Sequence, residues 1–260
     1  MSGVILVVVD GARPDAFLIA RCPNIQALIA RGSSTLHART VMPCLTLPCH
    51  TSMFYSVPPL RHGIFSNEWV PFAHQLPGLF DQLHAAKLKA AFLYNWEPLR
   101  DLSQPGTLAF SYFRDNATTP DGDQVIADEA ARFLASERPD FAFVYLGTVD
   151  MAGHAFGWMS DEYLRQLERV DTALGTVLAA VNGTHTIVLQ SDHGGHDRQH
   201  GLNIWEDMTI PWIAAGPQIR RTHTIAGAVS LLDTATTIAR LWNLPTPASW
   251  QGQCLNEIFV

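Results

Sequence analysis

The sequence predicts an α/β protein, an α/β/α sandwich in which helices cover both faces of one mostly parallel sheet. Short, continuous apolar runs such as Val4–Val9 are typical of strands that are buried on both faces. Amphipathic stretches of helical length, such as Asp161–Val181, alternate with these runs along the whole chain. There is no internal repeat and no linker, so the 260 residues are expected to form a single domain over residues 1–260.

The composition excludes several classes of protein. With 47% apolar residues the chain can bury a large core, and its net charge of -7 argues against a nonspecific nucleic-acid groove. The first apolar run is too short to span a membrane, and neither a basic segment nor a cleavage site accompanies it. We therefore expect a cytoplasmic protein without a membrane partner. The four cysteines form no CxxC pair and are expected to be buried or free thiols.

In the first half of the chain, predicted strands alternate with helices and polar loops. The strand Val4–Val9 is followed by a helix over Pro23–Arg31 that stops at Gly32. Pro48 suits the first turn of a second helix, which places Thr46 near its N-terminus. The other elements expected here are a strand over Ser34–Val41, an irregular loop over Pro58–Trp69, a helix over Gly78–Ala86 and a strand over Ala90–Tyr94.

The second half continues the alternation. Residues 96–120 contain several breakers and are expected to form loops with one edge strand. The helix Asp121–Glu137 has acidic residues early and basic residues later, which suits the helix dipole. The remaining predicted elements are a strand over Phe141–Gly147, the helix Asp161–Val181, a strand over Thr184–Gln190, a strand and turn over Met208–Pro217 and a helix over Ser230–Leu241.

Polar side chains follow the predicted strands at their carboxyl ends, where open α/β sheets place their sites. Asp10 follows the first strand, and Asp150 follows Phe141–Gly147 with His154 four residues later. The richest stretch is Ser191–Gly201, with three histidines and two aspartates. Carboxylates and imidazoles without thiolates suit zinc, manganese or iron, and zinc is the first choice.

These ligands are more than one tetrahedral ion needs, so two ions are expected. Two metal ions about 3.5–4 Å apart are a standard clamp for in-line displacement at phosphorus. The hydroxyl of Thr46 faces unpaired N–H groups at the positive end of its helix, which favours an alkoxide or a phosphoryl group. We therefore expect two Zn2+ ions, with Mn2+ or another divalent metal as the alternative, and Thr46 as a covalent nucleophile.

Six motifs follow one another within residues 4–217. They are Val8-Val9-Asp10-Gly11-Ala12-Arg13-Pro14, Pro43-x-x-Thr46-Leu47-Pro48-x-His50, His62-Gly63-Ile64-x-x-Asn67, Asp150-x-x-Gly153-His154, Ser191-Asp192-His193-Gly194, and His200-Gly201 before Met208 and Gly216-Pro217. In this order they resemble the alkaline phosphatase superfamily and, within it, the type I phosphodiesterase/nucleotide pyrophosphatase family. Each motif alone is weak, whereas the ordered set is specific.

The resemblance implies an alkaline-phosphatase-like fold and a role for each matching position. The ligands of one zinc would be Asp10, Thr46, Asp192 and His193, and those of the other Asp150, His154 and His200. Thr46 would pass through a phospho-threonine intermediate. Asn67 and the backbone N–H after Thr46 would hydrogen-bond the phosphoryl oxygens, as in an oxyanion hole.

The sequence departs from the family's pattern in three respects. Cys49 stands where the family usually has asparagine, which weakens an assignment to the nucleotide-specific members. Six residues separate His193 from His200, where relatives usually carry a long insertion, so His196 competes for the last ligand position. The following Gly201 favours His200. The chain also leaves no room for a large cap insertion, and an open pocket is expected.

Several functions remain alternatives to a phosphodiesterase or nucleotide pyrophosphatase. A phosphomonoesterase and a phosphonoacetate-type hydrolase belong to the same superfamily, and the latter also uses threonine and two zincs. A sulfatase would need a C/S-x-P-x-R pattern, which Cys44 and Cys49 lack. A phosphoglycerate mutase would need a serine nucleophile and an inserted domain. An inactive module that binds a metal or phospholigand is the alternative of another class, and the complete ligand set with Thr46 argues against it.

Diester and monoester hydrolysis differ in what surrounds the second substituent on phosphorus. Candidate partners of a phosphate dianion are Arg13, Arg61 and Arg198, although such arginines are more often solvated. Aromatic side chains near the motifs that could stack on a base or aryl group are Trp69, Phe72, Trp96, Phe156 and Trp158. The expected partner is a small-molecule phosphate ester, nucleotides included, and the oligomeric state is left open.

Overall fold

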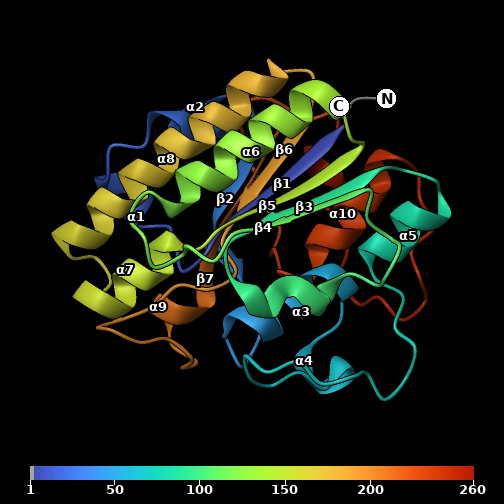
Figure 1. Ribbon diagram of the computed structural model, residues 1–260, viewed down its shortest axis with the longest axis horizontal. Coiled ribbons are helices and arrows are strands. Elements are labelled where there is room, and N and C mark those ends of the chain that lie inside the picture. The colour runs from blue at the N-terminus through green and yellow to red at the C-terminus, as the bar shows by residue number, and fades with distance from the viewer. Residues whose placement is uncertain (1–2) are drawn as a thin grey trace.

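The computed structural model describes residues 3–260, and its strands form one sheet between two layers of helices (Figure 1). The strands are β1 (Val4–Val9), β2 (Ser33–Arg39), β3 (Ala90–Tyr94), β4 (Phe110–Phe113), β5 (Phe141–Leu146), β6 (Thr186–Gln190), β7 (Thr209–Ala215) and β8 (His223–Thr224). Their order is β4-β3-β5-β1-β6-β7-β2-β8. β1 pairs in parallel with β5 and β6, whereas β7 is antiparallel to β6 and β2. The predicted α/β/α sandwich with a mostly parallel sheet is confirmed.

Helices connect most of the strands. Within the described residues they are α1 (Ala16–Ile19), α2 (Pro23–Arg31), α3 (Thr46–Tyr55), α4 (Pro59–His62), α5 (Leu79–Ala85), α6 (Gly122–Glu137), α7 (Thr148–Phe156), α8 (Asp161–Val181), α9 (Trp205–Met208) and α10 (Asp233–Leu241), with short 3-10 helices η1 (Glu97–Leu102) and η2 (Asn256–Ile258). None of these helices has both the length and the apolar character that crossing a membrane requires.

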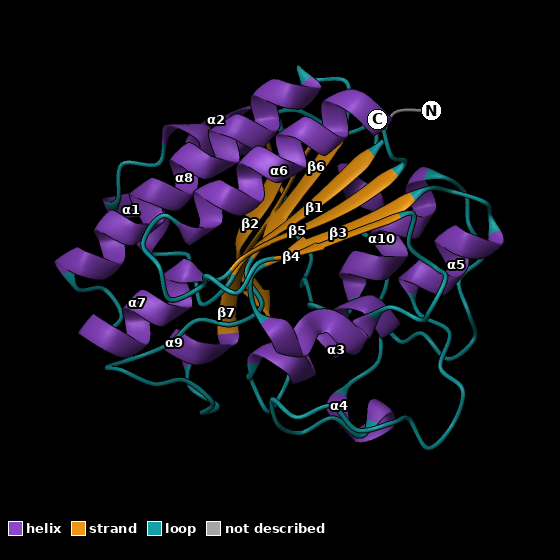
Figure 2. Cartoon of the chain, viewed as in Figure 1, coloured by secondary structure: helices purple, strands orange, loops and turns teal. Residues whose placement is uncertain are grey.

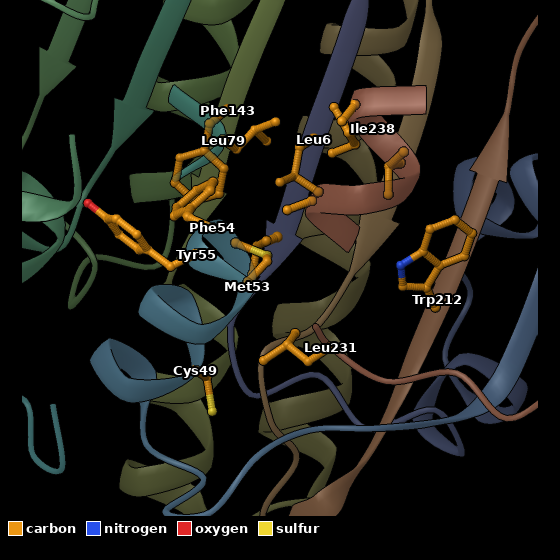
Figure 3. Packing of buried hydrophobic residues seen from close by; sticks show 14 of the residues in the cluster. Leu6, Cys49, Met53, Phe54, Tyr55, Leu79, Phe143, Trp212, Leu231 and Ile238 are labelled. Carbon is orange, nitrogen blue, oxygen red and sulfur yellow. The ribbon is translucent and has the colours of Figure 1, made fainter. Parts of the chain in front are cut away.

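Helices cover both faces of the sheet (Figure 2), and the core lies in two layers, one on each face. Alternate side chains of a strand point to opposite faces, and those of β1 divide accordingly. Ile5 and Val7 pack with residues of α2, α6 and α8, whereas Leu6 packs with residues of α3, α5 and α10. Figure 3 shows the second layer, with Phe54 of α3 and Ile238 of α10 on either side of Leu6. Burial on both faces explains why β1 reads as one continuous apolar run.

The structure differs from the predicted elements mainly in the connections. The segment Pro58–Trp69, predicted to be an irregular loop, contains helix α4, and β5 leads almost directly into the unpredicted helix α7. The antiparallel direction of β7 was not predicted, because a strand buried on both faces has the same apolar pattern in either direction. The edge strand predicted within residues 96–120 is β4, and the other long elements agree to within a few residues.

The sheet includes all the strands of residues 3–260, and no separate cap domain stands on it. This agrees with the expected absence of a large cap insertion. That the whole chain forms one domain, residues 1–260, stays a prediction.

Candidate active site

Three neighbouring strands deliver carboxylates to one edge of the sheet. Asp10 directly follows β1, Asp150 lies in the first turn of α7 after β5, and Asp192 follows β6. Because β5, β1 and β6 are adjacent and parallel, their carboxyl ends meet at the same edge. The predicted site residues, which are up to 190 positions apart, are thereby brought together.

The inner cluster consists of Asp10, Asp192 and His193, whose ligand atoms lie within 4.8 Å of one another. His193 Nε2 is 3.2 Å from Asp10 Oδ1 and 3.5 Å from Asp192 Oδ2. Thr46, the first residue of α3, donates from Oγ1 to Asp10 Oδ2 at 3.4 Å and lies 3.3 Å from His193 Nε2. All four side chains are buried, so the cluster is shielded from solvent.

The outer cluster consists of Asp150, His154 and His200. Asp150 and His154 are four residues apart on α7 and therefore share one face of the helix. His154 Nε2 is 3.4 Å from Asp150 Oδ2, and His200 Nε2 is 3.6 Å from Asp150 Oδ1. The rings of His193 and His200 stack with centroids 3.8 Å apart, so the two clusters are in contact.

The donor atoms of both clusters fit cations. Three buried carboxylate oxygens have no hydrogen-bond partner within residues 3–260: Asp10 Oδ1, Asp150 Oδ1 and Asp192 Oδ2. Burial, followed by the charge of Asp10, raises the pKa of both Asp150 and Asp192 well above the ordinary carboxyl value. Unpaired buried carboxylates oppose folding, and divalent cations bound by carboxylates and imidazoles offset that cost. The residues therefore fit the predicted pair of metal ions.

His200 belongs to the outer cluster, whereas His196 contacts Asp207. The Nδ1 atom of His196 lies 2.7 Å from Oδ1 of Asp207, a buried residue of α9. The Nδ1 atom of His200 lies 2.9 Å from the carbonyl of Cys44, so Nδ1 carries the proton and Nε2 faces Asp150. Of the two candidate histidines, His200 has the position of a ligand, and its role as ligand stays a prediction.

The side chain of Asn67 lies beside the start of α3. The backbone N–H of Leu47, which was expected to bind a phosphoryl oxygen, donates to Asn67 Oδ1 at 3.0 Å. An N–H can only donate, so the contact fixes the orientation of the amide, and the Nδ2 group remains to donate to another acceptor. Asn67 and the Leu47 N–H thus form a pair, with Asn67 exposed to solvent.

The family model for type I phosphodiesterases/nucleotide pyrophosphatases matches residues 4–100 and 81–211. The chain belongs to this family. Human ectonucleotide pyrophosphatase/phosphodiesterase family member 1 is 26% identical over 196 residues, which are 66% of this chain and 21% of that protein. An uncharacterised pyrophosphatase/phosphodiesterase of Schizosaccharomyces pombe is 24% identical over 231 residues, 79% of this chain and 47% of that protein. The chain therefore spans less than half the length of these relatives.

Solved structures show the same fold as this family member. Murine ectonucleotide pyrophosphatase/phosphodiesterase 5, in an inactive form in complex with AMP, gives a TM-score of 0.84 at 14% identity and covers 100% of both chains. A mutant of alkaline phosphatase PafA gives a TM-score of 0.84 at 13% identity over 99% of this chain and 98% of that chain. The fold is therefore alkaline-phosphatase-like, as the sequence motifs predict.

Two residues approach the inner cluster of this family member without having been assigned a role. The hydroxyl of Tyr145, on β5, donates to Asp10 Oδ2 inside the core. The imidazole of His50, on α3, lies 2.8 Å from the carbonyl of Thr46 through its Nδ1 atom. In the sequence, Tyr145 could be singled out only because its hydroxyl stands inside an apolar run. His50 could be singled out only because it belongs to the motif that contains Thr46.

The three candidate arginines have different surroundings, and Arg198 borders the outer cluster, with its carbonyl 3.0 Å from Nδ1 of His154. Arg13 donates to Asp15 through Nε and Nη2, at 3.0 and 2.6 Å, and to the carbonyl of Gly195 through Nη1 at 3.1 Å. Arg61 is exposed on α4, and Arg198 lines a surface cavity. The guanidinium of Arg13 is thus engaged with protein acceptors.

Two open cavities of about 740 Å³ each lie along the segments that carry site residues. Phe156, Trp158 and Arg198 are among the residues that line the first, and Trp158 packs edge-on against His154 of the outer cluster. Phe156 is 55% exposed whereas Trp158 is 6% exposed, so Phe156 is the aromatic ring available to a ligand. The second cavity is lined by parts of residues 69–81, which follow Asn67 in the chain.

A buried network holds the first turn of α7. Asp123 Oδ2 accepts from the N–H and the hydroxyl of Thr148 at 3.2 and 2.6 Å, and its Oδ1 accepts from Asn95 at 2.7 Å. Asn95 Oδ1 in turn accepts from the N–H of Gly147 at 3.2 Å. Burial raises the pKa of Asp123 to about 6 despite these hydrogen bonds. The network fixes the helix that carries Asp150.

We expect Asp123→Asn to remove part of the pH dependence of stability. Because its folded-state pKa of about 6 lies above the ordinary 3.8, Asp123 favours folding fully below about pH 4 and loses this contribution as the pH rises through 6. The stability of the wild type relative to the variant should fall by up to roughly 3 kcal/mol between about pH 4 and 7. Urea denaturation of both proteins across this pH range measures their free energies of unfolding. If the difference between the two free energies did not change with pH, the raised pKa of Asp123 would be wrong.

Proposed function

We propose that this chain is a metal-dependent hydrolase of phosphate esters, with phosphodiesters or nucleotide pyrophosphates as preferred substrates. The position of Thr46 Oγ1 carries the proposal, because this hydroxyl lies 3.4 Å from Asp10 Oδ2 and 3.3 Å from His193 Nε2. A hydroxyl at a helix N-terminus beside a carboxylate–imidazole cluster is the arrangement of an activated nucleophile. Membership of the family, and the AMP bound by a relative of the same fold, support a small phosphate ester as substrate.

We propose two zinc ions as the metals. The inner one would be held by Asp10, Thr46, Asp192 and His193 and the outer one by Asp150, His154 and His200. When bound, such ions lower the pKa of the threonine hydroxyl and of a water molecule, and they offset charge on the phosphoryl group. The stacked rings of His193 and His200 keep the two sites next to each other.

The reaction would proceed in two displacements at phosphorus. Thr46 Oγ1 attacks in line and gives up its proton towards Asp10 Oδ2, its hydrogen-bond acceptor. A phosphorus–oxygen bond to Thr46 would form as the bond to the leaving oxygen breaks, and that oxygen would take the proton from Asp10 and depart as the alcohol. Water would then attack the phospho-threonine, the bond to Thr46 would break, one proton of the water would return to Thr46 Oγ1, and the other would stay on the released phosphate. The Nδ2 group of Asn67 would donate to a non-bridging oxygen while the Leu47 N–H holds its carbonyl.

Two observations favour a diester over a monoester. The guanidinium of Arg13 donates to Asp15 and to the carbonyl of Gly195, so it has no pair of N–H groups free to bind a phosphate dianion in a bidentate manner. The cavity beside Trp158, which packs against His154 of the outer cluster, offers space for the further organic substituent that a diester carries and a monoester lacks.

Hydrolysis of bis(p-nitrophenyl) phosphate and p-nitrophenyl phosphate, each with zinc and after chelation, tests the proposal. We expect metal-dependent release of p-nitrophenol from both esters, with kcat/KM for the diester at least about tenfold higher.

Phe156→Ala should lower kcat/KM for the diester more than for the monoester, and Leu60→Ala, at an exposed position of α4, is the matched control. A preference for the monoester would identify a phosphomonoesterase. No metal-dependent release from either ester would contradict the proposal and favour a phosphonate hydrolase or a binding module.

A further inference from the structure

We propose that His50 is a positioning residue, and that the N–H of its imidazole holds the turn at Thr46 in place beside Asp192. The catalytic part of this inference rests on the proposed function. Its structural part, an effect on cation binding at the inner cluster, stands without it.

The position of the imidazole proton follows from its acceptor. His50 Nδ1 lies 2.8 Å from the carbonyl oxygen of Thr46, which can only accept, so Nδ1 carries the hydrogen. The same Nδ1 is 3.5 Å from Asp192 Oδ2, one of the buried carboxylate oxygens without a hydrogen-bond partner. The N–H therefore donates to the backbone of the nucleophile, and a carboxylate of the inner cluster lies next to the same nitrogen without a hydrogen bond to it.

The surroundings of His50 hold the ring in one orientation. The side chain is fully buried, and its ring packs edge-on against Phe143 and Tyr145, with centroids 5.9 and 5.3 Å away. Tyr145 itself donates to Asp10 Oδ2. Beneath the inner cluster, His50 and Tyr145 thus form a layer that supports Thr46, Asp192 and Asp10. Supporting residues of this kind orient ligands and nucleophiles for reaction.

The two ring nitrogens of His50 have different surroundings, and this difference allows an experiment to distinguish a positioning role from a packing role. His50 Nε2 has no hydrogen-bond partner within residues 3–260, so polar interactions of the ring pass through Nδ1 alone. Asparagine places its amide N–H near the position of Nδ1, whereas glutamine places it near Nε2. If His50 only packs, the effects of His50→Asn and His50→Gln should depend on the size of the new side chain. If His50 positions Thr46 through Nδ1, His50→Asn should be the milder of the two substitutions.

The first experiment measures zinc binding by competition with a chelating indicator in the wild type, His50→Asn, His50→Gln and the exposed control His84→Gln. We expect His50→Gln to weaken one of the two zinc sites about 10–100-fold, and His50→Asn to stay within a few-fold of the wild type. Equal effects of the two amides, or none, would overturn the proposal whether or not the chain is a hydrolase.

The second experiment measures kcat and KM with bis(p-nitrophenyl) phosphate. His50→Gln should lower kcat by about 100-fold with little change in KM, because misplacing a nucleophile affects the reaction more than binding. His50→Asn should restore most of kcat. No activity in the wild type would contradict the proposed function and leave the zinc result to decide the role of His50.

A third measurement needs no variant and remains decisive if His50→Gln does not fold. Nitrogen NMR of the wild-type chain labelled in histidine reports which ring nitrogen carries hydrogen. We expect the neutral Nδ1–H tautomer at His50. An Nε2–H tautomer would overturn the proposal, because Nδ1 could then not donate to the carbonyl of Thr46.

Discussion

Thr46→Ala is expected to lower kcat for bis(p-nitrophenyl) phosphate by at least about 1,000-fold while two zinc ions remain bound. The substitution removes Oγ1, which lies 3.4 Å from Asp10 Oδ2 and 3.3 Å from His193 Nε2. The inner cluster keeps its other donors, and Tyr145 still donates to Asp10. The variant should therefore fold and bind metal. Steady-state kinetics and metal analysis on the same preparation separate the two effects.

Thr46→Ser is the matched control, because it keeps the hydroxyl and loses one methyl group. We expect it to retain a measurable part of the wild-type kcat and to yield a phosphorylated serine when the reaction is quenched with acid. Wild-type rates in Thr46→Ala would show that another group, such as a water molecule, attacks phosphorus directly. The covalent mechanism would then be wrong, although the hydrolase assignment would stand.

Removal of bound metal is expected to abolish turnover and to lower the melting temperature by about 5–10 °C relative to the protein in zinc at about 100 times its Kd. Without cations, Asp10, Asp150 and Asp192 share one buried region, and each has a carboxylate oxygen without a hydrogen-bond partner. Their mutual repulsion and lost hydration oppose folding. Differential scanning calorimetry with and without a chelator measures the change.

Asp10→Asn provides a control with an effect of opposite sign. It removes one charge from the inner cluster and keeps a side-chain oxygen that can accept from Tyr145. The metal-free variant should therefore melt above the metal-free wild type, while zinc should stabilise it less. Equal melting temperatures for the wild type with and without zinc would contradict a metal centre at these residues.

The fold and the clustering of the candidate site residues could be predicted from the sequence because both are visible in local patterns. Buried strands such as β1 are continuous apolar runs, and the polar residue that follows each of them marks the functional edge of a parallel sheet. The ordered motifs then indicated which residues meet, and the structure places Asp10, Asp192 and His193 together as those motifs imply.

The supporting residues could not be predicted because their partners are set by tertiary packing. Asp123 lies at the start of a long amphipathic helix, where an acidic residue is ordinarily a cap, and its contact with Thr148 spans 25 positions. Tyr145 is one more apolar position of β5 until the neighbouring strand places Asp10 against its hydroxyl. The sequence favours His200 over His196 through Gly201 alone, whereas the contact of His196 with Asp207 is set by tertiary packing.

The inner cluster joins parts of the chain that lie far apart in sequence. The N–H of Gly11 donates to Asp192 Oδ1 across 181 positions. An ion shared by Asp10 and Asp192 would be a removable cross-link, comparable to a disulfide bond that closes a loop of about 180 residues. Cross-links that close long loops exclude many conformations of the unfolded chain. The supply of metal would then govern how long the folded chain survives proteolysis, in addition to whether it reacts.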